Sequence, residues 1–178
     1  MATRTHKSQT SYTDDAVLTT TYADDFITKG NGFQIKKRID LISCQTIYLE
    51  FDITKAVGKM VYSLPLRMST GGGMVYVDSY NADSSTGGTV LATPNNLNGK
   101  SSTAALTTVK TGVTVTGTAT NVREYVVGIH SAKQSSGGWQ GGVDIPKILD
   151  NSKPLYFKIE NKESDTVVLD FKFVWYEI

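Results

Sequence analysis

The sequence predicts an all-β protein, a sandwich or barrel of antiparallel strands, from three observations. Ser and Thr make up about a fifth of the 178 residues and 16 residues are Gly, whereas Leu-, Ala- and Glu-rich helical stretches are nearly absent. Apolar and polar residues alternate with a period of two in several segments. Turn residues separate these segments at short intervals, which gives roughly eight to ten strands.

The first strand candidates follow the turn signal Asn31-Gly32. Residues 33–40 alternate apolar and polar side chains and predict a half-buried strand. Residues 45–53, QTIYLEFDI, have the clearest alternation in the chain. We expect the polar set of this strand to lie on the solvated face of an antiparallel sheet; the set comprises Tyr48, Glu50 and Asp52.

Residues 60–68 continue the alternation, with Met60, Tyr62, Leu64, Leu66 and Met68 on one side. Because Pro65 cannot donate a hydrogen bond to a neighbouring strand, we expect this strand to lie at a sheet edge or to bend there. Residues 74–80, MVYVDSY, predict another strand. The next segment, NADSSTGG at 81–88, has the composition of a loop.

The middle of the chain is rich in Thr and Val, whose branched side chains suit a pleated surface. TVLAT, ALTTVK and GVTVTG are short strand candidates, and VREYVVGIH at 122–130 is a further one. Residues 133–142 have the composition of a Gly/Ser loop that carries Trp139. Residues 143–150 contain Pro146 and fit either a short helix or an extended segment that enters a turn.

Two strands close the sequence, PLYFKIEN and VVLDFKFVWYEI, with a hairpin turn at Glu163-Ser164-Asp165. The last strand has apolar residues on both faces, and either an oligomer contact or a loop of the same chain must cover Val168, Val174 and Tyr176. The predicted core consists of the alternating apolar residues of three strands: Ile47, Leu49, Phe51, Ile53, Leu155, Phe157, Ile159, Leu169, Phe171 and Phe173.

We expect two parts, an N-terminal arm at residues 1–30 and a single sandwich domain at residues 31–178. The arm is polar and has no sustained helix or strand period, yet it carries Tyr12, Tyr22 and Phe26. These three residues are candidate interface residues, because a solvated tail does not require so many apolar side chains. A disordered terminus is the alternative.

Composition excludes several classes of protein. No apolar run approaches the ~18–20 residues of a transmembrane helix, and the N-terminus lacks the apolar segment of a signal peptide. The single cysteine, Cys44, cannot form an intrachain disulfide, and no Cys/His spacing typical of a metal site occurs. A formal net charge of +1 gives no strong electrostatic footprint for nucleic acid. We therefore expect no membrane, nucleic acid, metal or cofactor.

Two polar segments resemble ligand sites on first inspection. In PNNLNGKSS at 94–102, Gly99-Lys100-Ser101 stand in P-loop register, but Pro94 replaces the first Gly and no helical pattern follows. We interpret this segment as a structured polar loop. Asp78, Asn81 and Asp83 could offer oxygen ligands to Ca²⁺, although the EF-hand spacing is absent and such residues also cap their own turns.

Catalytic patterns are weak. Cys44 with His130, or the acids Glu50 and Asp52, are the groups an enzyme could use, but no nucleophile elbow occurs, and we predict no enzymatic activity. The other histidine, His6, lies in the arm. Trp139, in SSGGWQGG, is a candidate interface anchor or sugar-stacking platform, unless it folds back over a sheet edge.

Three motifs point to a family. TVLATPNNLNGKSS contains an Asn-rich P-x-N-x-N-x-x-S turn, GGWQGG precedes an extended segment, and KPLYFKIENKESDTVVLDFKFVWYE forms a closing hairpin with Trp-Tyr-Glu. On these motifs, residues 58–178 resemble the small head decoration (cement, or auxiliary capsid) proteins of tailed bacteriophages. Family members often carry Arg after the second Asn, where this chain has Gly99-Lys100, and the arm has no counterpart.

The resemblance implies a jelly-roll-like β-sandwich, commonly a homotrimer, that binds the outside of an icosahedral shell at local threefold positions. The implied partner is the major capsid protein, and the implied location is the capsid exterior of a virion assembled in the bacterial cytoplasm. A different class remains open, a receptor- or glycan-binding module of a tail fibre or tailspike. Such a module would use Trp139 and the tyrosines for stacking.

Overall fold

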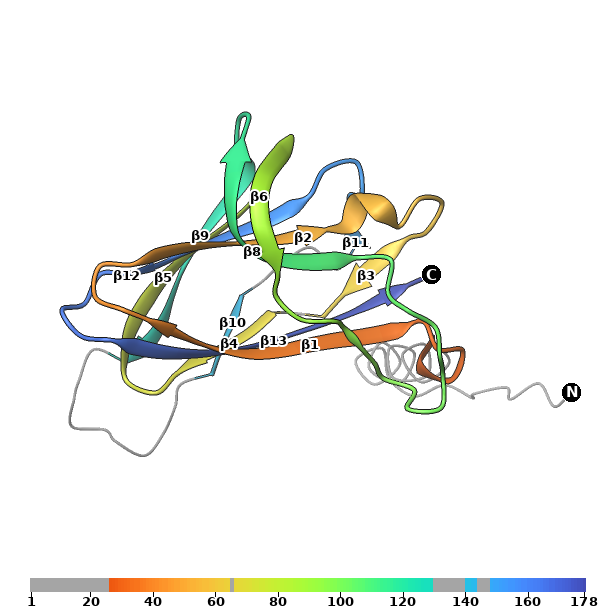
Figure 1. The fold of residues 1–178 in the computed structure, drawn as a ribbon, viewed down its shortest axis with the longest axis horizontal. Coiled ribbons are helices and arrows are strands. Elements are labelled where there is room, and N and C mark those ends of the chain that lie inside the picture. Colours follow the sequence, from red (N-terminus) through yellow and green to blue (C-terminus); the bar gives the residue numbers. More distant parts are fainter. Residues whose placement is uncertain (1–25, 65, 130–139, 144–147) are drawn as a thin grey trace, which may run out of the picture.

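The protein folds as a sandwich of two antiparallel sheets, which confirms the predicted fold class (Figure 1). The structure is a computed structural model, and it describes residues 26–64, 66–129, 140–143 and 148–178. Three candidate interface residues, Tyr12, Tyr22 and Trp139, lie outside these described residues.

Sheet A forms the lower layer in Figure 1. Its described strands are β1 (Gly32–Leu41), β3 (Val61–Ser63), β4 (Leu66–Thr70), β7 (Asn95–Asn96), β10 (Gln140–Val143), β11 (Ile148–Leu149) and β13 (Val167–Glu177). The order is β10-β4-β13-β1-β7, and β3 also pairs with β13 and with β11. The central pair is β1 and β13, joined from Gly32↔Tyr176 to Leu41↔Val167. Part of the predicted Gly/Ser loop is thus strand β10.

Sheet B forms the upper layer. Its described strands are β2 (Thr46–Asp52), β5 (Gly73–Asn81), β6 (Ser84–Val90), β8 (Thr108–Thr116), β9 (Thr120–Ile129) and β12 (Leu155–Asn161). They lie in the order β6-β8-β2-β12-β5-β9. A short 3-10 turn, η1 (Ile53–Lys55), follows β2.

The core between the sheets follows the predicted period of two. Every predicted core residue is buried except Ile47, which is half-buried and packs against the others. Phe51 links the two layers, because its ring meets Phe157 of sheet B at 5.4 Å and Phe173 of sheet A at 4.5 Å, both edge to face. Trp175 is fully buried and stacks on Phe173 at 5.4 Å.

Along residues 60–68, the buried side chains change from odd-numbered to even-numbered positions. Val61 and Ser63 are buried, whereas Met60 is exposed and Tyr62 half-buried, so the predicted phase is wrong there and correct at Leu66 and Met68. Between the pairs Ser63↔Trp175 and Arg67↔Lys172, three residues of this segment stand opposite two of β13. One extra residue is a β-bulge, which reverses the two faces. Pro65 itself, where we expected a sheet edge or a bend, lies outside the described residues.

The predicted loop at 81–88 is wrong, because most of it is strand β6. β6 pairs with β8 from Ser84↔Thr116 to Val90↔Lys110. It lacks large apolar side chains because it is an exposed edge strand. ALTTVK and GVTVTG likewise contribute to one strand, β8, with Gly112 in its middle at φ +70. The positive φ of Gly87, Gly88 and Gly112 lets this hairpin turn out of the sheet.

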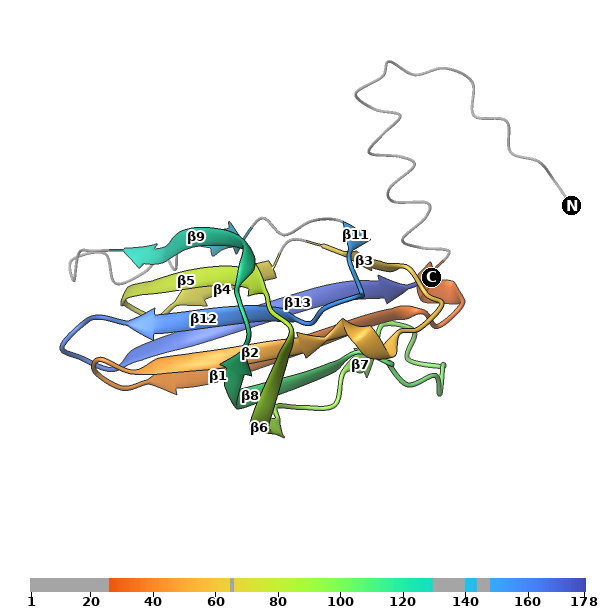
Figure 2. The same cartoon turned by 90° about the horizontal axis from the view of Figure 1, so that it is seen from above.

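We name the far part of this hairpin, residues 82–87 and 113–119, the arch. It stands above sheet B in Figure 1, and Figure 2 shows it running across the strands of that sheet. Ala82 and Val113 of the arch form a second buried cluster with Tyr80 and Tyr156 of sheet B. The arch therefore covers part of the outer face of sheet B.

This cover overturns the prediction of a solvated face on β2. Glu50 is only 3% exposed and Asp52 only 8%. Glu50 accepts a hydrogen bond from the Ser85 hydroxyl of the arch, and Lys110 Nζ lies 3.6 Å from its other oxygen. Asp52 accepts a hydrogen bond from Thr54 Oγ1 at 2.6 Å. Both carboxylates are satisfied within the fold, as buried charges require.

The outward face of β13 is covered in part by the same chain. The Tyr176 ring meets Phe26 at 5.9 Å and Tyr62 at 6.2 Å. For Tyr176, cover by the same chain is therefore the correct explanation of its apolar character. Val168 and Val174 remain half-buried on this face.

Candidate binding surface on sheet A

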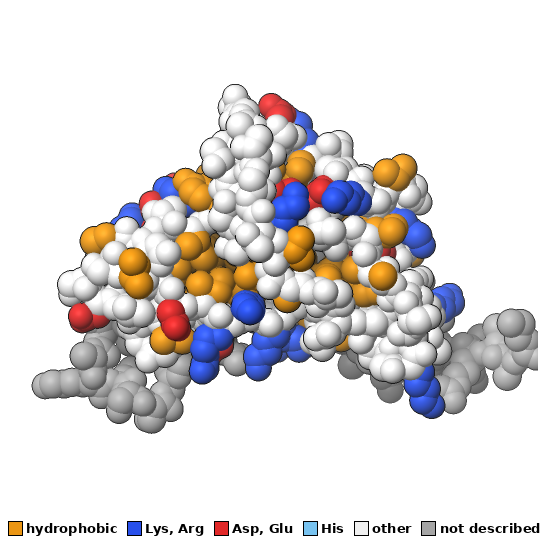
Figure 3. Space-filling view, in the orientation of Figure 1, with side chains coloured by type: hydrophobic (Ala, Val, Ile, Leu, Met, Phe, Trp, Pro, Cys, Tyr) orange, Lys and Arg blue, Asp and Glu red, His pale blue; other side chains and the backbone are white. Residues whose placement is uncertain are grey.

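Three cations stand side by side on the outer face of sheet A. The register pairs Lys36 of β1 with Lys172 of β13, and Lys172 with Arg67 of β4. We name these three residues the cation row. Neighbouring strands lie about 4.8 Å apart, so side chains directly opposite on one face are within reach of one another. Figure 3 shows Lys and Arg side chains along the lower margin of the molecule, where sheet A lies.

Asp170 compensates the cation row only in part: after the hydrogen bonds from Arg38, the charge of Lys36 helps to lower the pKa of that carboxyl, but no salt bridge of the described residues joins the two. All three side chains are exposed, and none takes part in an ion pair of the described residues. Like charges directly opposite one another in a sheet are destabilising. The row therefore costs stability in the isolated domain instead of contributing to it.

The nearest acid on this face is already engaged. Asp170 receives two hydrogen bonds from Arg38, at 3.0 Å from Nε and 2.8 Å from Nη2. These hydrogen bonds, followed by the attraction of the Arg38 charge and then of the Lys36 charge, hold the pKa of Asp170 below its ordinary value. The bidentate geometry fixes both partners and leaves the cation row without a salt bridge to Asp170.

A shallow cleft of about 220 Å³ opens beside the row, lined by Lys36, Arg67, Ser69, Asp170, Phe171 and Lys172. Its cationic and hydroxyl groups can donate hydrogen bonds to oxyanions, and its one carboxylate, Asp170, already accepts two hydrogen bonds from Arg38. The surface is therefore suited to bind carboxylates of a partner.

The groups considered for catalysis are described only in part. Cys44 is exposed in a tight turn at φ +56, and its candidate partner His130 lies outside the described residues, as does His6. Glu50 and Asp52 have the structural partners given above. None of these groups supplies a nucleophile and base in contact within the described ranges.

The segment 94–102 is a structured polar loop, as predicted. Asn96 Nδ2 donates to the carbonyls of Gly30 and Thr103, at 2.8 and 3.0 Å, and Asn98 Nδ2 donates to Thr28 O at 3.0 Å. The oxygen of Asn98 accepts from the Lys100 backbone N–H at 3.0 Å. The loop thus fastens residues 28–30 to the sandwich, and the ring of Phe26 is held over Tyr176 nearby.

The three oxygen-bearing residues weighed for Ca²⁺ have separate partners. Asp78 faces Lys158 at 3.9 Å, Asn81 donates to Pro154 O at 3.2 Å, and Asp83 pairs with Lys153 at 2.6 Å. Across the described residues, no three His, Cys, Asp or Glu side chains gather as a metal site.

The cation row was not predicted from the sequence, because each member occupies an ordinary polar position of its own strand. Only the register of β1, β13 and β4 places them together. In the described ranges no helix has the length and apolar character to cross a membrane. Comparisons with protein-family models, with curated proteins and with solved structures find no match to this chain.

Proposed function

We propose that the protein is a non-enzymatic structural protein of a bacteriophage virion, which binds the outside of the capsid through the outer face of sheet A. The cation row carries the proposal. Three adjacent cations that form no salt bridge with a described residue are unfavourable in the free domain and become favourable against a surface that presents carboxylates. The motifs shared with head decoration proteins support the major capsid protein as the partner.

We further propose a homotrimer, as the resemblance implies. Each domain would make a modest contact, and linking three of them raises the overall affinity well above that of one contact. The half-buried Val168 and Val174 on β13 are available for subunit contacts. Light scattering should give a trimer mass, and a monomer mass at high micromolar concentration would contradict this part.

The arm is proposed to reach a neighbouring subunit or the shell through Tyr12 and Tyr22. Phe26 lies at the root of the arm and packs on Tyr176, which fixes where the arm leaves the sandwich. Deletion of residues 1–25 keeps this contact, so it should leave the domain folded and weaken capsid binding. Unchanged capsid affinity would contradict a binding role for the arm.

The test of the main proposal is co-sedimentation with shells assembled from the proposed partner, the major capsid protein of the same phage. We expect the wild-type protein to sediment at about one copy per capsid subunit, and the triple variant Lys36→Gln/Arg67→Gln/Lys172→Gln to bind at least tenfold more weakly. The matched control is Lys158→Gln/Lys162→Gln on sheet B, which should bind as the wild type does.

The outcomes separate the two parts of the proposal. If the wild-type protein does not sediment with shells, the capsid function is wrong. If it sediments and the triple variant binds equally well, the function stands and the assignment of the surface is wrong. Affinity that falls as salt concentration rises is also expected, because the contacts are between exposed charges.

A further inference from the structure

A second recess lies on the opposite side of the molecule, between the arch and sheet B. Its volume is about 330 Å³, within the lower range of small-ligand sites. Tyr48 of β2 and Tyr80 of β5 form the floor, and the arch forms the roof with residues 113–115, Gly117 and Ala119. We name this recess the tyrosine cleft. It is separate from the cation row, which lies on the other sheet.

The floor of the tyrosine cleft is a fixed aromatic surface. Tyr80 is only 8% exposed, and its ring stacks on the fully buried Tyr156 with centroids 5.8 Å apart. Burial, followed by the nearby Tyr48, Tyr156 and Asp78, raises the pKa of Tyr80 to about 12. Its phenol is therefore neutral at physiological pH and can both donate and accept a hydrogen bond.

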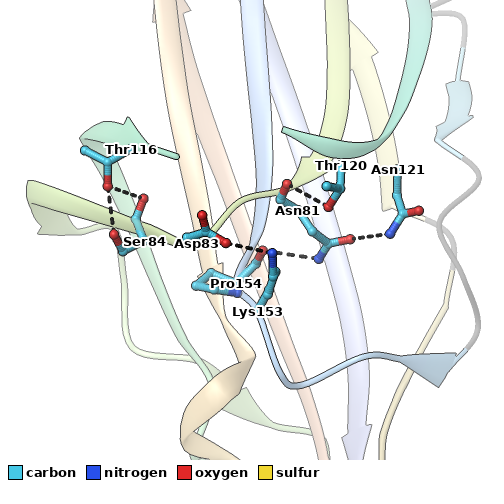
Figure 4. A network of polar contacts seen from close by, with 8 residues as sticks. All are labelled: Asn81, Asp83, Ser84, Thr116, Thr120, Asn121, Lys153 and Pro154. Carbon is cyan, nitrogen blue, oxygen red and sulfur yellow. Dashed lines mark hydrogen bonds and ion pairs between the residues drawn. The ribbon is translucent and has the colours of Figure 1, made fainter. Parts of the chain in front are cut away.

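The roof is anchored at both of its ends, as Figure 4 shows. On one side the hydroxyls of Ser84 and Thr116 lie 2.7 Å apart, and Asp83 is held by Lys153. On the other side Thr120 Oγ1 donates to Asn81 O at 3.3 Å. A recess whose walls are already ordered binds a ligand at a lower entropic cost.

The charges near the cleft are mutually neutralised. Lys158 lies 2.8 Å from Glu160 and 3.9 Å from Asp78, and no charged side chain lines the cleft itself. A charged ligand therefore gains no unpaired partner. A neutral ligand with one flat apolar face and several hydroxyl groups matches both the tyrosine rings and the polar groups, which include the hydroxyl of Thr114.

We propose that the tyrosine cleft binds a sugar ring of a neutral glycan, with the C–H face of the ring packed on Tyr48 and Tyr80. This inference does not depend on the capsid proposal. A virion protein that also binds glycans would present the cleft outward while sheet A faces the shell, because the two surfaces lie on opposite faces of the sandwich.

The test is an array printed with neutral oligosaccharides from bacterial surface polysaccharides, with sialylated and sulfated glycans as charged comparisons. The full-length protein should be retained by at least one neutral glycan. Two variants alter the cleft differently: Tyr48→Ala removes part of the floor, and Ala119→Trp fills the space from an exposed position of the roof. Both should weaken the signal at least tenfold.

Tyr76→Ala is the matched control. Tyr76 also lies on the outer face of sheet B, under Lys162 at 4.2 Å, but it does not line the cleft. It should bind as the wild type does, and thermal unfolding of each variant verifies that it is folded. Retention by no glycan, retention by charged glycans only, or a signal that survives in both cleft variants overturns the proposal.

Discussion

The two outer faces of the sandwich differ in how their charged residues are paired. On sheet B, Lys158 bridges Asp78 and Glu160, Lys162 meets Glu160 at 3.7 Å, and Lys110 meets Glu50. On sheet A, the bidentate Arg38–Asp170 pair stands beside three cations that form no salt bridge within the described part of the chain. These charges of sheet B therefore find their partners within the chain, whereas the cation row of sheet A forms no salt bridge with a described residue.

The same contrast holds for cover. The arch buries Tyr156 and Glu50 on the outside of sheet B, so this face behaves locally as a second core. No comparable cluster is present on the outside of sheet A among the described residues, where only the rim near Tyr176 is covered. A face that is charged, open and electrostatically unfavourable by itself is the one that a partner would complete.

Removing the largest side chain under the arch should have the largest effect. Tyr156→Ala deletes a fully buried ring and leaves a cavity, so we expect the free energy of unfolding to fall by about 3 kcal/mol or more. Val174→Ala, at an outward position of β13, should cost less than about 1 kcal/mol. Urea unfolding measures the free energy of unfolding of both variants, and the dependence of that free energy on urea concentration should stay unchanged. Similar small losses would mean that the arch does not cover sheet B in solution.

Charge reversal should change stability with opposite sign on the two faces. Lys172→Glu places an acid between Lys36 and Arg67, so we expect stabilisation by roughly 0.5–1 kcal/mol. Lys158→Glu places a third acid beside Asp78 and Glu160 and should destabilise by a similar amount. Chemical denaturation at low salt measures the change in the free energy of unfolding for both variants. At high salt both changes should be smaller, because salt screens exposed charges. Destabilisation by Lys172→Glu would show that the cation row is not strained.

The smallest effect concerns pH. Hydrogen bonds from Arg38 lower the pKa of Asp170 in the folded state, so this contribution to stability is present above the unfolded carboxyl pKa of about 4. It is lost as pH falls through the folded pKa. Arg38→Ala should raise the pKa of Asp170 in an NMR titration, and its stability deficit should vanish at the acid end. A constant deficit across that range would contradict the pairing.

The core between the two sheets could be predicted, because the alternation of apolar and polar residues indicates which side chains of a strand share a face. It identified Leu49, Phe157 and Phe173 as core without any knowledge of pairing. The same pattern could not reveal that Glu50 is buried, because the arch that covers it comes from residues far along the chain. The bulge between Ser63 and Arg67 is also a property of pairing, since one inserted residue reverses the faces.

The candidate surfaces could be predicted less well than the core. Lys36, Arg67 and Lys172 are separated by 31 and 105 positions along the sequence, and each alone fits a solvated strand position. Their adjacency follows only from the order β1-β13-β4. The tyrosine cleft could not be predicted for a related reason, because its floor comes from β2 and β5 and its roof from residues 113–119, which only the fold brings together.

Lysine acetylation footprinting of the protein, free and bound to shells, tests most directly whether the open face is the docking face. Mass spectrometry would follow Lys36 and Lys172 on sheet A together with Lys158 and Lys162 on sheet B. We predict that Lys36 and Lys172 are protected at least tenfold in the bound protein, while Lys158 and Lys162 react as they do in the free protein. Protection confined to Lys158 and Lys162, or none at Lys36 and Lys172 in protein that has sedimented with shells, would contradict the account.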